Sequence, residues 1–130
     1  MAHWSDAYIG RPYIHGEADC GHLCLAVSKE VFGVRLPDDA QVEHVQSRLG
    51  RFHQLTDVVE AFMSPAAEPR EGDIALLYCR ARKSHVGIYC VVDGFPSILH
   101  AVEKPGMVVR HRLSDLPKAF LSVEGYYRWN

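Results

Sequence analysis

The spacing of apolar residues changes once along this chain of 130 residues, close to Gly72. Before it, residues 20–31 place apolar side chains at i, i+3, i+4, i+7 and i+11, which is the period of one helix face. After it the period is two, as in strands. Because helices precede strands, the pattern predicts an α+β fold in which N-terminal helices pack on an antiparallel β-sheet. The predicted strands are 73–79, 85–92, 97–102, 107–113 and 122–129.

Composition limits the class of protein. Hydrophobic residues make up 48% and charged residues 23% of the chain, which predicts one globular domain spanning residues 1–130. The net charge is -2 without a basic run, so a nucleic-acid partner is not indicated. No apolar run reaches the length of a membrane span, and the first ten residues lack the features of a signal peptide. We therefore expect synthesis in the cytoplasm without a signal peptide.

Three helices are predicted. The first begins after Asp19, a good N-cap, and stops at Gly33, which places Cys20 in the first turn. Two others are expected at 38–49 and 56–62. Residues 64–72, with two prolines and a glycine, are predicted to be the crossing from the helices to the sheet.

Asp93-Gly94 predicts a two-residue type I′ hairpin turn, in which Val92 faces Phe95. Counting back along both strands sets His85 and His100 on the same face as diagonal neighbours. Two imidazoles can bridge that distance. Gly87, which falls opposite His100, is expected to leave open space beside it.

A cysteine at the start of a helix and beside an imidazole is suited to nucleophilic catalysis, because both features lower the pKa of a thiol. We expect Cys20 to be the nucleophile, His85 the base and His100 the residue that orients it. The Cys20 amide is a candidate oxyanion donor. A zinc site with Cys20, His22 and Cys24 is the weaker alternative, since a second cysteine pair is lacking, and no metal or cofactor is expected.

The remaining cysteines and most histidines are predicted to have no role in catalysis. Cys24, Cys79 and Cys90 are expected to be buried thiols without disulfides. Five histidines in polar surroundings are expected to be ordinary surface residues; these are His3, His15, His44, His53 and His111.

Three segments, PYIHGEADC, SHVGIY and ILHA, follow one another in an order that resembles the NlpC-type cell-wall cysteine peptidases. The resemblance implies a papain-like fold and an enzyme that cuts the stem peptides of peptidoglycan. It also implies Cys20 as nucleophile, His85 as base and His100 as orienting residue. The matching positions are Pro12-Tyr13, Gly16, Asp19-Cys20, Gly72-Asp73, His85 to Tyr89, and His100-Ala101.

Other residues near these motifs are candidates for contacts with substrate or the oxyanion. Tyr13 is a candidate second oxyanion donor, and Asp19 could shape the substrate site as well as cap the helix. Gly21 and His22 stand where the family has Ser-Gly, and Ser84 precedes the predicted base.

Residues 27–37 resemble the small family members encoded with phage tail proteins. The resemblance implies phage tail proteins as partners and the virion as the location. An alternative follows from Gly21 and His22: a chain that keeps the fold as a structural part of a tail and has weak activity or none.

Overall fold

The computed structural model describes residues 2–14, 20–35, 62–80 and 82–130 of the chain, without the side chains of residues 82–84. Several predictions fall outside this part: the Asp19 cap, the helix at 38–49, and the helix at 56–62 apart from Phe62. Among the described residues, no helix is long and apolar enough to cross a membrane.

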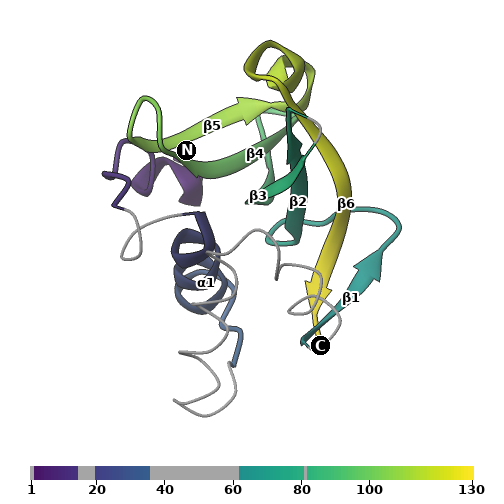
Figure 1. Cartoon of the computed structure of the whole chain (residues 1–130). Helices are drawn as coiled ribbons and strands as arrows, with labels where there is room; N and C mark the ends of the chain where they lie inside the picture. The colour runs from purple at the N-terminus through teal and green to yellow at the C-terminus, as the bar shows by residue number, and fades with distance from the viewer. Residues whose placement is uncertain (1, 15–19, 36–61, 81) are drawn as a thin grey trace.

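Helix α1 (Cys20–Glu30) confirms the first predicted helix and places Cys20 in its first turn. Gly33 follows with a positive φ of 64°, as expected for a residue just past a helix end. The helix packs on strands β3 (Arg82–Val92) and β4 (Phe95–Val102), and it lies below β4 in the view of Figure 1. Its buried residues are Cys20, Gly21, Leu23, Cys24, Leu25, Val27 and Ser28.

One antiparallel sheet of six strands has the order β1-β6-β2-β3-β4-β5. Strands β2 to β5 form the predicted meander, and the last strand returns to pair with β2 (Figure 1). The helix packed on this antiparallel sheet makes the fold α+β. The strands not yet given are β1 (Met63–Ala66), β2 (Ile74–Cys79), β5 (Met107–Arg112) and β6 (Leu121–Trp129).

Two elements differ from the sequence-based prediction. Strand β1 lies in the segment expected to be only a crossing, and its Pro65 pairs with Tyr127 of β6. A proline lacks the N–H that a central strand needs, and β1 accommodates it because it is an edge strand. The 3₁₀ segment η3 (Leu113–Ala119), with Pro117 inside it, was also not predicted.

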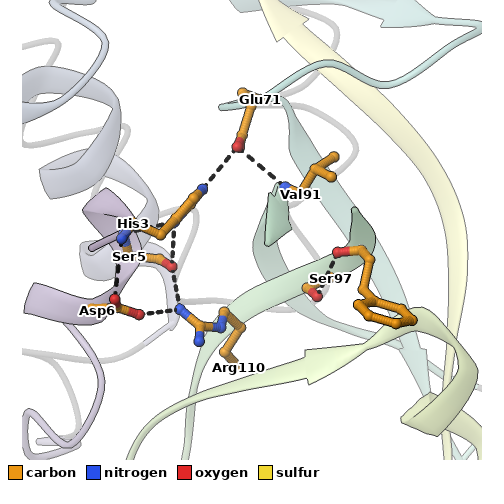
Figure 2. A network of polar contacts seen from close by, with 8 residues as sticks. His3, Ser5, Asp6, Glu71, Val91, Ser97 and Arg110 are labelled. Carbon is orange, nitrogen blue, oxygen red and sulfur yellow. Dashed lines mark hydrogen bonds and ion pairs between the residues drawn. The ribbon is translucent and has the colours of Figure 1, made fainter. Parts of the chain in front are cut away.

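The N-terminal segment is tied to the sheet by polar contacts (Figure 2). His3 caps the short 3₁₀ segment η1 (Trp4–Ala7) by accepting from the Ser5 N–H, and its Nε2 lies 2.8 Å from Oε1 of Glu71. The same Glu71 oxygen accepts from the Val91 N–H at 3.2 Å. The prediction of His3 as an ordinary surface residue is therefore wrong, because its two ring nitrogens connect η1 to the segment before β2.

Arg110 anchors β5 to the same N-terminal segment. Its Nη1 donates to Ser5 Oγ and to Asp6 Oδ1, both at 2.6 Å (Figure 2). The bond from Arg110 lowers the pKa of the Asp6 carboxyl. These contacts hold the outer strand of the meander in place.

The two faces of the β3–β4 hairpin pack into different clusters. Val86, Ile88, Leu99 and Ala101 join the cluster formed with α1. The opposite face contributes Tyr89 and Ile98 to a second cluster; its other buried members are Ala75, Leu77, Leu116 and Leu121. Because both faces are covered, a polar side chain on this hairpin needs a partner within the protein.

The hairpin turn has the predicted geometry and register. Asp93 and Gly94 have φ values of 52° and 82°, and type I′ turns require positive φ at both positions. Val92 pairs with Phe95, and the register continues to the pair of Ile88 and Leu99. The register on which the predicted shared face of His85 and His100 depends is therefore correct.

Gly87 does not leave open space, contrary to expectation. A Cβ atom built there would lie 2.5 Å from Ile98 Cγ2 and 3.2 Å from His100 Cβ. Real Cβ atoms do not approach other atoms as closely as the first distance. The neighbouring strand thus fills the place that a side chain would take.

Replacing Gly87 by alanine should therefore strain the hairpin. We expect Gly87→Ala to lower the free energy of unfolding by about 1–3 kcal/mol, the usual cost of overpacking. Urea unfolding of the purified protein measures this. The matched control is Gly125→Ala in β6, where the nearest atom to the new Cβ is the Tyr127 hydroxyl at 3.3 Å. Equal losses in the two variants would contradict the steric explanation.

Candidate active site

The centre of the site is a contact between two histidine rings on neighbouring strands. His85 Nε2 lies 2.7 Å from His100 Nδ1, and the ring centroids are 4.9 Å apart in an edge-to-face arrangement. His85 is partly buried, and His100 has no exposed surface. The predicted meeting of these two rings is confirmed.

A β-bulge precedes His85 in β3. Leu77 of β2 pairs with His85, but the next residue, Tyr78, pairs with Lys83, so Ser84 is the extra residue. Bulges bend a strand and re-aim the side chains beside them. The side chain of Ser84 itself lies outside the described residues.

A third histidine extends the pair. His111 Nδ1 lies 2.8 Å from His100 Nε2, and their ring centroids are 5.0 Å apart. The prediction of His111 as an ordinary surface residue is wrong, because the ring is partly buried and bonded to a buried one. Counting through the next hairpin shows the signal: Met107 faces Val102, which sets His111 opposite Ile98 and on the face of His100.

Burial sets the electrostatics of the rings. It lowers the pKa of His85 to about 4. The pKa of His100 lies well below its usual range, first because of burial and then because of repulsion from charge on His85 and His111. Both shifts disfavour the charged, imidazolium form of these rings. A neutral imidazole has one donor and one acceptor nitrogen, which suits a ring that bonds on both sides.

Cys20 lies at the N-terminal end of α1, where the helix dipole favours a thiolate. Its side chain belongs to the same core cluster as Val86, the residue after His85. Side chains alternate along a strand, so Val86 faces α1 and His85 faces the opposite side of β3, where its strand partner Leu77 belongs to the second cluster. The approach of the Cys20 thiol to His85 stays a prediction.

The other predicted site residues lie on two elements. The Tyr13 N–H donates to the Gly106 carbonyl at 2.8 Å, so the N-terminal segment runs beside the β4–β5 turn. Gly21 is buried and His22 partly buried in the first turn of α1. Asp19 lies outside the described residues.

The described residues form neither a disulfide nor a metal site. All four cysteines lie in the described part of the chain, and none is joined to another by a disulfide. Within that part, no group of three or more His, Cys, Asp or Glu side chains is arranged to hold a metal ion. The ring nitrogens of the three histidines point at one another instead of at a common centre.

The α+β fold and the paired histidines are consistent with one protein family. A model of the NlpC/P60 family matches residues 10–120, and the chain belongs to this family. Membership supports a cell-wall peptidase or hydrolase, with peptidoglycan as the substrate that the class suggests. Searches of curated proteins and of solved structures found no match.

The lowered pKa of the buried rings predicts how stability depends on pH. Between about pH 6.5 and 4, an unfolded chain binds a proton at each position where the folded His85 and His100 stay neutral. Because the unfolded state binds more protons in this range, the free energy of unfolding should be highest above pH 6.5. It should fall toward pH 4 by up to about 1.4 kcal/mol per pH unit for each ring.

Urea unfolding between pH 7 and 4 measures this slope. The matched variant is His85→Asn, whose amide does not titrate, and it should show a shallower slope than the wild type. Identical slopes would mean that His85 titrates in the folded protein as it does in the unfolded chain.

Proposed function

We propose that the protein is a cysteine endopeptidase that hydrolyses amide bonds in peptidoglycan stem peptides. Cys20 is the nucleophile, His85 the base and His100 the residue that orients the base. The observation that carries the proposal is the 2.7 Å contact between His85 Nε2 and His100 Nδ1, made in a member of the NlpC/P60 family. A base held by a second polar group is the arrangement that a thiol nucleophile needs.

The hydrogen bond assigns the two nitrogens of His85 to different tasks. Nε2 is bonded to His100, which leaves Nδ1 for the thiol. Nδ1 takes the proton of Cys20, and the thiolate attacks the amide carbonyl carbon. The proton then passes from Nδ1 to the leaving nitrogen as the C–N bond breaks. Water, deprotonated by Nδ1, hydrolyses the thioester and restores the thiol.

Because His85 is buried, its charged form depends on a thiolate nearby. The desolvation that lowers its pKa to about 4 disfavours an isolated imidazolium. A thiolate beside Nδ1 opposes that effect, because an opposite charge favours the charged ring. The ion pair of Cys20 and His85 therefore forms as a unit, and the pH dependence of the rate is expected to be bell-shaped.

The proposal includes a papain-like arrangement and a phage-tail context. The similarity of residues 27–37 to small tail-associated members supports the context, with tail proteins as partners and the virion as the location. In the alternative, Gly21 and His22 mark a descendant kept as a structural tail part. Virions carrying Cys20→Ala discriminate the two hypotheses. If the protein is an enzyme, the virions should assemble normally but fail to pass through intact cell wall. Unchanged infection would support a structural role in the tail.

Cys20→Ala should abolish the release of soluble peptides from purified peptidoglycan, with a rate loss of at least about 10³-fold because the nucleophile is missing. Mass spectrometry of the soluble fraction measures the release and identifies the bond that is cut. The control is Cys79→Ser, which changes a cysteine of β2 outside the proposed site and should keep the wild-type rate. Equal release by the wild type and Cys20→Ala would exclude Cys20 as the nucleophile.

A further inference from the structure

The geometry points to His111 as a positioning residue of the same site: it accepts a hydrogen bond from His100 and thereby sets the direction of the bond between His100 and His85. This inference rests on the proposed function, in which His85 must become an imidazolium. His111 lies outside the three residues that the sequence motifs indicate, on a strand that follows them in the chain.

Three strands build a continuous row of rings. His85 comes from β3, His100 from β4 and His111 from β5. The middle ring has no exposed surface, and both of its nitrogens are bonded, Nδ1 to His85 at 2.7 Å and Nε2 to His111 at 2.8 Å. Because a neutral imidazole carries one proton, the direction of one of these bonds fixes the direction of the other.

Only one direction suits the base. When His100 donates from Nε2 to His111, its Nδ1 is an acceptor and can receive the Nε2 proton of a charged His85. When His111 donates instead, the proton of His100 lies on Nδ1 and faces Nε2 of His85. An imidazolium donates from both nitrogens, so in that second arrangement two protons oppose each other. An acceptor at His111 Nδ1 therefore favours the state that catalysis uses.

The charged neighbours of His111 in β5 are engaged elsewhere. The two arginines beside it in β5 have other partners: Arg110 bonds to Ser5 and Asp6, and the guanidinium of Arg112 lies 3.8 Å from the centroid of the Phe95 ring. The complete burial of His100 makes the acceptor important. A buried N–H without a partner is unfavourable, so His100 without His111 should move its proton to Nδ1.

A matched pair of variants separates the acceptor from the bulk of the side chain. Asparagine places Oδ1 one bond from Cγ, where histidine has Nδ1, and can accept from His100. Leucine has the same number of non-hydrogen side-chain atoms as asparagine and the same branching, but no acceptor. The full chain carrying His111→Asn or His111→Leu is compared with the wild type in two measurements. One is the tautomer of His100, from the ¹⁵N shifts of labelled histidine, and the other is the rate of peptide release from purified peptidoglycan.

We expect the Nε2–H tautomer of His100 in the wild type and in His111→Asn, with kcat of the latter within about threefold of the wild type. His111→Leu should shift His100 to the Nδ1–H tautomer and lower kcat on the order of 10- to 100-fold, with little change in KM, because the base is less well oriented. If the leucine variant does not fold, His111→Ala replaces it.

The inference is overturned if His100 keeps its tautomer in the variant without an acceptor, or if His111→Asn loses as much activity as His111→Leu. The tautomer measurement needs no substrate, so it separates this inference from the proposed function. A wild type that releases no peptide through Cys20 refutes the proposed function and the catalytic purpose of His111. The tautomer result still decides whether His111 sets the direction of the bond.

Discussion

The two-residue turn at Asp93-Gly94 brings His85 and His100 together. Positive φ at both positions fixes the register of β3 against β4. A slip of one residue would move His85 and His100 to opposite faces of the sheet. Gly87 reinforces the register, because Ile98 fills the space that a side chain would need. A local turn preference thus decides whether two residues fifteen positions apart can share a proton.

Burial makes the row of histidines depend on hydrogen bonding. A buried imidazole needs hydrogen-bond partners for its nitrogens. Each of the two bonds, between His85 and His100 and between His100 and His111, supplies a partner to both rings that it joins. The outer strand of the row is held from the other side by Arg110, whose bonds to Ser5 and Asp6 attach β5 to the N-terminal segment. The N-terminal segment and His111 are therefore connected through β5.

Much of this arrangement could be predicted from the sequence, for local reasons. The helical period of residues 20–31 gave α1, and alternation with the turn residues gave five strands and the contact of His85 with His100. Strand β1 was missed because prolines usually exclude strands and only pairing with β6 explains this one. His111 was missed because the register count stopped at one hairpin, although the same count through the next one, where Met107 faces Val102, sets His111 on the face of His100. The predicted approach of Cys20 to His85 depends on how α1 packs against β3, which no local pattern encodes.

The rate at which each cysteine reacts with iodoacetamide reports whether His85 activates Cys20. Mass spectrometry of the folded protein at neutral pH gives the rate for every cysteine, with the partly exposed Cys79 as internal reference. We predict that Cys20 reacts faster than Cys79 in the wild type and that His85→Asn removes this advantage, because a thiolate is the reactive form. An unchanged rate at Cys20 in that variant would show that His85 does not activate the thiol.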